Sequence, residues 1–231
     1  MRRVMLLIVG LGTGALLMAL LCVNATAQYG QLRQTDVQGV EMLPISLPSQ
    51  VEDTGLLAVR LASYDGPFLE DGTGDEVVGV AALVIENTGG TMVSEGSVIL
   101  VQGERMLVFE LTGLPPGACA LVLEKDRQSN SADAIQACWG WVRREYPENM
   151  GQVGVEHTGL GSLAFTNRTT EQIYKAEALF KNYDAVSGMY IGGISYLAEV
   201  AQLQAGETRV ISPPYFAVGY SKVVRVAIEI E

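Results

Sequence analysis

The sequence predicts an all-β protein in which an N-terminal signal segment precedes two tandem antiparallel β-sandwich units. Two observations predict the β class. Short runs rich in Val, Ile and Leu alternate with turn clusters of Gly, Asn and Pro, and no segment after residue 27 has a convincing helical period. A third observation predicts two units, because the pattern of strands and turns around residues 83–88 returns around residues 163–168.

Residues 1–27 have the layout of a bacterial-type secretory signal peptide. Arg2-Arg3 forms a positive start, Val4–Val23 carries no charge, and the small-x-small sequence Ala-Thr-Ala at residues 25–27 precedes Gln28. Cleavage before Gln28 leaves a mature protein that is secreted or otherwise extracytoplasmic.

The alternative is an uncleaved N-terminal anchor. The apolar stretch at residues 4–23 is close to the length that spans a bilayer. A lipoprotein is not expected, because Leu21 precedes Cys22 where a small residue is needed. In each case the positive end stays inside and the body of the chain lies outside. The membrane is therefore expected as a partner only through this segment.

The acidic composition limits the classes of partner. The whole chain has a formal net charge of −11 at pH 7, and without Arg2-Arg3 it keeps 13 basic and 26 acidic residues. A negative surface repels nucleic acids and anionic lipids, so no nucleic-acid partner is expected. Abundant apolar residues and the lack of long polar tracts in the sequence indicate a globular chain.

The first unit is predicted to span residues 56–147, after a connector at residues 28–55 that contains Pro44 and Pro48. Its elements follow in order: a strand at 56–62, an acidic Gly-rich loop at 64–76, a strand at 77–86 ended by a turn at 87–90, a hairpin with strands at 97–101 and 105–111, a turn at 114–117 and a strand at 119–124. Short strands separated by regular turns are typical of an antiparallel sandwich.

An internal echo predicts that this unit is repeated. Residues 83–88 (LVIENT) are similar to residues 163–168 (LAFTNR), and each strand ends in Asn followed by a polar residue. Each copy later reaches a turn that begins with Leu and ends with Gly, at residues 114–117 and 203–206.

The second unit is predicted to span residues 148–231, with a boundary near Pro147. The interval from the echoed Asn to the turn Gly is longer in this copy (167 to 206) than in the first (87 to 117), so its hairpin is longer, where residues 183–191 lie. Residues 172–179 have helical propensity, but Ile173 and its aromatic neighbours suit a strand equally. The pattern predicts two Ig-like sandwiches, and its alternative is a single irregular β-domain.

Part of the second unit resembles a known family. Residues 179–184 (LFKNYD) resemble the signature of FxLYD-type domains, which are small bacterial extracellular β-sandwiches. The turn at Asn167 and the sequence at residues 203–207 (LQAGE) fit the same pattern, whereas Asn182 stands where the family has Leu. The resemblance implies the fold. It implies no activity, because these domains share no catalytic residues.

The sequence predicts a protein that is not an enzyme. Its one histidine, His157, alternates with Val153 and Val155 and is expected at a strand end near the surface. The sequence contains no Gly-x-Ser-x-Gly and no Ser-x-x-Lys motif, and a Ser or Cys nucleophile needs a positioned base. Paired carboxylates, which suffice for a glycosidase, remain the alternative in so acidic a chain.

No cofactor and no metal ion are expected. Two cysteines after the signal segment and one histidine do not complete a tetrahedral zinc site. In the acidic loop, Asp71, Thr73 and Asp75 at alternate positions can place oxygens around a calcium ion, but the bidentate Glu of a calcium loop is not in its place. A solvated hairpin loop is the preferred interpretation.

Cys119 and Cys138 are predicted to form a disulfide. They are the cysteines that follow the signal segment, they lie 19 positions apart, and the predicted compartment is oxidising. Such a bridge stabilises a fold by about 3 kcal/mol. The alternative is two buried thiols.

The sequence Cys138-Trp139-Gly140-Trp141 is the candidate ligand site. In a strand, Trp139 and Trp141 share one face and Cys138 lies on the other. If Cys138 points inward, both indoles point outward and form a flat apolar platform of the kind that binds sugars. The alternative places both tryptophans in the core.

These features predict a secreted or surface-exposed, non-enzymatic module of the bacterial envelope that is structural or binds an unknown protein or glycan. One alternative is a carbohydrate-binding module that uses Trp139 and Trp141. Another is an accessory protein that docks an envelope enzyme or machine through its edge strands.

Overall fold

The computed structural model describes residues 34–35, 41–42, 45–145, 151–159 and 161–230. These residues form strands, turns and loops, and no helix occurs among them. The described residues therefore contain no helix that is long and apolar enough to cross a membrane. The predicted signal segment and the predicted boundary at Pro147 lie outside the described residues.

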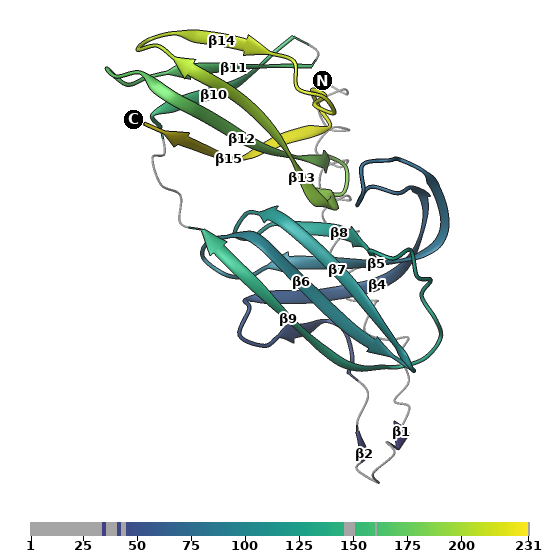
Figure 1. Cartoon of the computed structure of the whole chain (residues 1–231). Coiled ribbons are helices and arrows are strands. Elements are labelled where there is room, and N and C mark those ends of the chain that lie inside the picture. Colours follow the sequence, from purple (N-terminus) through teal and green to yellow (C-terminus); the bar gives the residue numbers. More distant parts are fainter. Residues whose placement is uncertain (1–33, 36–40, 43–44, 146–150, 160, 231) are drawn as a thin grey trace, which may run out of the picture.

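The N-terminal half contains two antiparallel sheets (Figure 1). Its strands are β1 (Gln34–Thr35), β2 (Glu41–Met42), β3 (Ser49–Val51), β4 (Leu56–Pro67), β5 (Glu76–Asn87), β6 (Met92–Gln102), β7 (Arg105–Leu114), β8 (Cys119–Leu123) and β9 (Ile135–Glu145). In one sheet β5 pairs with β4 and β8, and in the other β6 pairs with β7 and β9. The short strands β1 and β2 pair with each other.

The C-terminal half repeats this order of pairing. Its strands are β10 (Val153–Thr158), β11 (Ser162–Asn167), β12 (Ile173–Asp184), β13 (Met189–Leu203), β14 (Thr208–Ile211) and β15 (Ser221–Glu229). Here β11 pairs with β10 and β14, and β12 pairs with β13 and β15. Strand for strand, β10 to β15 therefore pair as β4 to β9 do.

Each half has a hydrophobic cluster, and the first cluster also includes Tyr190 of β13, with Tyr183 and Val224 packed against it. In the first, inward residues of both sheets meet, among them Leu83 of β5 and Phe109 of β7. In the second, Phe165 of β11 packs in one cluster with Phe180 of β12. The cause is the period of two along a strand, which sends alternate side chains to one face of the sheet.

A parallel strand pair joins the two halves. Tyr190 and Ile191 of β13 lie opposite Ala120 and Leu121 of β8. The result is a seven-stranded sheet with the order β15-β12-β13-β8-β5-β4-β3, which crosses from one half to the other in Figure 1. No local sequence pattern predicts this pairing, because its partners are far apart in the chain.

The predicted all-β class is confirmed, and the strand bounds differ in places. Strand β4 continues to Pro67, inside the predicted loop at 64–76, and β3 lies inside the predicted connector. Residues 173–179 form strand, because Ala176 and Ala178 are fully buried in the second cluster. Tertiary packing thus overrides their helical propensity.

The predicted disulfide between Cys119 and Cys138 is absent from the structure. Ala120 and Val122 of β8 pack in the first cluster, so Cys119 lies on the opposite face of that strand. Cys138 of β9 packs against the same cluster from the other sheet. Cys138 therefore points toward the first cluster and Cys119 points away from it, so the two side chains are not placed to form a bridge. Burial raises the pKa of the Cys138 thiol to about 11.

Candidate functional site

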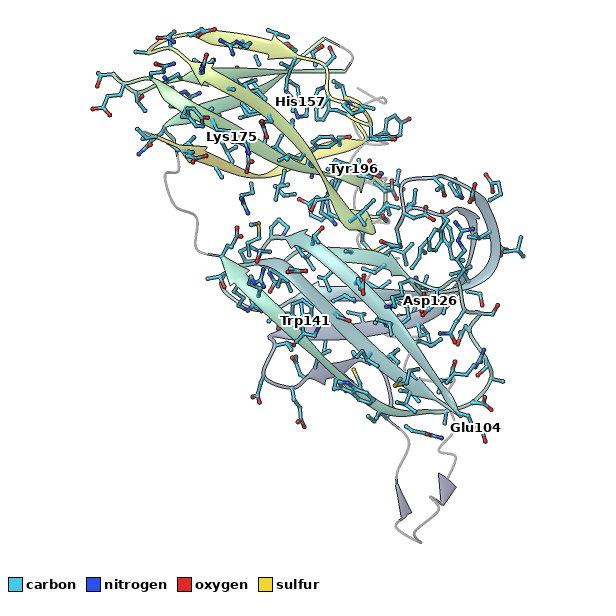
Figure 2. The ribbon with its side chains drawn as sticks, viewed as in Figure 1. Glu104, Asp126, Trp141, His157, Lys175 and Tyr196 are labelled. Carbon is cyan, nitrogen blue, oxygen red and sulfur yellow. The ribbon has the colours of Figure 1, made fainter. Side chains whose placement is uncertain are left out.

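Trp139 and Trp141 lie on the outer face of the sheet formed by β7, β6 and β9; Figure 2 labels Trp141 on this sheet. Their exposed fractions are 42% and 48%. Cys138 packs against the first cluster and so points inward, and alternation then turns both indoles outward. The interpretation that buries both tryptophans in the core is therefore wrong.

The two indoles belong to a larger apolar surface, which we call the aromatic face. It consists of Ile99, Val101, Met106, Val108, Trp139 and Trp141. One row across the three strands runs Trp139, Ile99, Val108, and the next runs Ala137, Val101, Met106. Inward neighbours of these residues, such as Leu100 and Phe109, fill the first cluster. Contiguous apolar surface of this kind marks interaction sites on soluble proteins.

Charged residues at the margin of the aromatic face are paired. Arg143 lies 3.1 Å from Glu95, and Lys125 lies 3.6 Å from Glu110. Ser97, which stands between Trp141 and Glu110 in the ladder, is only 4% exposed. The face is thus electrically balanced, on a chain whose formal net charge is −11.

The C-terminal half provides an internal comparison for this surface. Leu179 follows Asn167 by as many residues as Ile99 follows Asn87, and in its row it lies between Arg225 and Leu197. Arg225 therefore takes the place of Trp139.

The remaining positions of this second face are mainly charged. Ala227 stands at the place of Trp141, beside Glu177 and Glu199. Lys175 pairs with both acids, at 2.5 Å and 3.0 Å. A charged outer face is the ordinary solution for an antiparallel sheet with one side in water. The fold itself therefore does not require the aromatic face.

Glu70 links the two halves at the point where β8 and β13 separate. It lies in the loop between β4 and β5, and its carboxylate accepts hydrogen bonds from the backbone N–H of Leu123 (2.7 Å) and of Gly193 (2.7 Å and 3.0 Å). Both donors lie two positions beyond the last pair of the β8–β13 ladder. Burial raises the pKa of Glu70 to about 7, although these N–H groups and the charge of Lys181 oppose the shift.

Lys181 of β12 is fully buried in the same junction. Its ammonium group donates to the carbonyl oxygens of Thr112 (2.9 Å), Gly193 (2.7 Å) and Ile194 (2.8 Å). Three carbonyl groups match the three donors of an ammonium. Burial lowers the pKa of Lys181 to about 7, and the charge of Glu70 opposes this shift. Together the two side chains satisfy backbone N–H and C=O groups where the strands part.

A cavity of about 270 Å³ lies beside Glu70. Its lining residues are Phe68, Glu70, Asp71, Glu110, Leu123, Lys125, Asp126 and Ile194. Several carboxyl groups with one raised pKa are a pattern that also occurs in glycosidases. Here, however, both carboxylate oxygens of Glu70 accept backbone hydrogen bonds. Its raised pKa thus accompanies a structural role.

The loop considered for calcium is held by an arginine. Arg127 donates to Asp71 (2.8 Å) and to Asp75 (3.1 Å), and its guanidinium lies 4.5 Å from the centre of the Phe68 ring. Hydrogen bonds from Thr73 are the main cause, and Arg127 a further one, that lower the pKa of Asp71 to about 2. In this structure the acidic side chains of the loop are thus paired with the guanidinium group of Arg127. Among the described residues, no group of three or more His, Cys, Asp or Glu side chains is arranged to hold a metal ion.

His157 lies in β10 and is exposed, with its ring edge-on to Phe216 at 5.0 Å. Phe216 belongs to the second cluster, as do the partly buried Val155 and the buried Val153. His157 therefore continues the apolar side of its strand to the surface, and Figure 2 shows it in the other half of the molecule from Trp141.

Six residues of these sites were not predicted as site residues: Ile99, Val101, Met106, Val108, Glu70 and Lys181. For the first four a signal was present. Residues 98–101 and 106–109 are apolar at every position, whereas a strand with one face in water alternates. For Glu70 and Lys181 no local signal exists, because their burial arises from the contact between the two halves.

Comparisons of the chain with protein-family models, with curated proteins and with solved structures find no match. The function is therefore inferred from the sequence and the geometry.

Proposed function

We propose that this chain is an exported, non-enzymatic β-sandwich protein of the bacterial envelope that binds a glycan through its aromatic face. One observation carries the proposal. Equivalent outer faces in the two halves have different chemistry: one carries Trp139 and Trp141, and the other carries Arg225 and Ala227 at the same places. Because the fold accepts either set, the sandwich architecture itself does not require the tryptophans.

The proposal includes two tandem units, at residues 56–147 and 148–231. The shared order of strand pairing and the presence of a hydrophobic cluster in each half support it. The FxLYD-like sequence at residues 179–184 supports the same fold for the second unit, and the segment at residues 1–27 supports export, by cleavage or as an anchor.

A glycan fits the aromatic face better than the other ligand classes. Indole rings offer broad, rigid apolar surfaces on which the C–H faces of sugars can lie. The charged residues at the margin, Arg143 with Glu95 and Lys125 with Glu110, are paired with each other and offer no unpaired charge to an ionic ligand. The net charge of −11 repels polyanions.

A binding role rather than a catalytic one is supported by the use of the acidic residues. Glu70 is bound to the backbone of both halves, and Asp71 and Asp75 are bound to Arg127. A general acid needs a proton within reach of its substrate. These carboxyl groups instead use their hydrogen-bonding capacity within the fold.

The test is binding of the purified protein to a panel of soluble and insoluble glycans. We expect binding to at least one member, weakened at least tenfold by Trp139→Ala with Trp141→Ala. Tyr220→Ala is the matched control, because Tyr220 is an exposed aromatic residue (72%) outside the aromatic face. Equal binding by the double variant, or hydrolysis of a glycan that Glu70→Gln or Glu110→Gln abolishes, would contradict the proposal.

A further inference from the structure

The aromatic face extends in two dimensions. Along β9 the two indoles are one two-residue step apart, about 7 Å, and across the sheet the row from Trp139 through Ile99 to Val108 covers two strand spacings, about 10 Å. A single sugar chain laid along the two indoles leaves Ile99, Val101 and Val108 uncovered. The apolar surface is thus broader than one chain needs.

The face is also held in place from below. Gly140 sits between the indoles, and a Cβ there would collide with the Ser97 carbonyl oxygen and lie 3.1 Å from Cγ1 of Val51. Strand β9 therefore packs closely against β6 and β3 at Gly140. Both indoles are carried by this closely packed strand.

Directed hydrogen-bonding groups are scarce on the aromatic face. Ser97 is only 4% exposed, and Arg143 and Glu110 are already paired at the margin. A soluble oligosaccharide loses hydration of its hydroxyl groups and conformational freedom on binding, and a site for it must supply hydrogen bonds in return. A broad apolar face instead gains free energy from the removal of apolar surface from water, in proportion to the area covered.

We propose that the ligand of the aromatic face is the ordered surface of an insoluble, uncharged polysaccharide. This inference rests on the proposed function and narrows it. In such a solid, neighbouring chains are already fixed side by side and their hydroxyl groups bond to one another, so a plane of C–H groups faces the solvent. That plane matches the breadth of the aromatic face and the paired charges at its margin.

The experiment measures depletion of the full chain from solution by microcrystalline cellulose and by crystalline chitin, with cellohexaose and chitohexaose as soluble competitors. The variant is Trp139→Arg with Trp141→Ala, which installs the residues found at the equivalent places, Arg225 and Ala227. Tyr220→Ala is the control. We expect one solid to bind the wild type and the control, at least tenfold weaker binding of the variant, and no competition by millimolar hexaose.

The possible failures are distinguishable. If a hexaose binds through the tryptophans or competes at millimolar concentration or below, the proposed function stands and this inference falls. If only peptidoglycan sacculi or phosphatidylcholine vesicles bind through the tryptophans, or if the variant changes the oligomeric state in sedimentation, this inference also falls. If no probe depends on Trp139 and Trp141, both proposals fall.

Discussion

Asn87 and Asn167, which echo each other in the sequence, share three side-chain hydrogen bonds in the two halves. The side-chain amide of each donates to the carbonyl oxygen four residues later and to that of Leu114 or Leu203, at distances of 2.8 to 3.0 Å. The side-chain oxygen of each accepts from the N–H two residues later. Each asparagine thus ties the turn after its strand to the end of another strand.

The backbone of the same residues completes the equivalence. The carbonyl oxygen of Asn87 accepts from the N–H of Gly117 (2.8 Å), and that of Asn167 accepts from the N–H of Gly206 (3.1 Å). These glycines are the turn glycines of the repeated sequence pattern. The echo is therefore visible because a small set of side-chain and turn contacts fixes those residue types.

We expect Asn87→Ala and Asn167→Ala to destabilise the protein by similar amounts. Both asparagines are buried, and the change leaves two carbonyl groups and one N–H without this partner, at a cost of about 2 to 3 kcal/mol for each variant. Urea denaturation measures the free energy of unfolding, with the exposed Thr170→Ala as control. A loss below about 0.5 kcal/mol for either variant, which is the usual size for a surface site, would contradict this role.

The sequence predicted what depends on short spacing and missed what depends on contact between distant segments. Strands β5 to β8 follow from apolar runs and turn residues, whose preferences act over a few positions. The orientation of Cys119 depends on which face of β8 meets the core, so the bridge predicted from two cysteines in one chain is absent. The burial of Lys181 depends on where the two halves meet.

The candidate site shows the same division. Trp139 and Trp141 were predicted to share one face, which alternation along one strand decides. Whether that face points outward depends on the position of β9 in its sheet. The apolar neighbours Ile99 and Val108 come from two other strands, and only the ladder register brings them beside Trp139.

Removal of either partner at the junction is expected to destabilise the protein strongly. Lys181→Met leaves three carbonyl groups without their donor, and Glu70→Gln replaces an acceptor by an amide whose N–H₂ group faces backbone donors. We expect a loss of about 3 to 5 kcal/mol for Lys181→Met. In a double-mutant cycle with Glu70→Gln, the combined loss should be smaller than the sum, because the two charges interact. Strict additivity in urea denaturation would contradict the coupling.

The junction should also give the stability a pH dependence. The pKa of Glu70 is raised in the folded protein from 4.5 to about 7, so the folded state holds this proton more tightly than the unfolded state. Its contribution to folding is present below pH 4.5 and is lost as the pH rises through about 7. Relative to Glu70→Gln, the wild type should lose up to about 3 kcal/mol of unfolding free energy over that window.

Lys181 acts in the opposite range. Its pKa is lowered from 10.5 to about 7, so its contribution is present above pH 10.5 and is lost as the pH falls through about 7. Denaturation curves from about pH 4 to 10 for the wild type, Glu70→Gln and Lys181→Met separate the two groups. A pH profile that neither variant changes would show that both groups titrate as in the unfolded chain.

Cys119 and Cys138 are both expected to remain thiols in the purified protein. Cys119 and Cys138 lie on different strand faces, and the raised pKa of Cys138 disfavours its reactive thiolate. Alkylation of the denatured protein without reductant should add two groups to the mass, and alkylation of the native protein under mildly alkaline conditions should be slow at Cys138. An unreduced mass with no alkyl group would show the bridge that the sequence predicts.

The aromatic face should be dispensable for folding. Trp139→Arg with Trp141→Ala places at the outer sheet the residues that Arg225 and Ala227 supply at the equivalent positions, so the backbone already tolerates them. Both indoles are nearly half exposed, and we expect a change of about 1 kcal/mol or less in the free energy of unfolding.

Leu100, which points inward from the same sheet, provides the contrast with the outward tryptophans. Leu100 is fully buried in the first cluster, so Leu100→Ala should cost about 2 to 5 kcal/mol through lost burial and a cavity. Urea denaturation of the three proteins compares the two faces of one sheet directly. If the tryptophan variant loses as much stability as Leu100→Ala, the indoles serve the fold. The difference between the two outer faces would then no longer support a ligand.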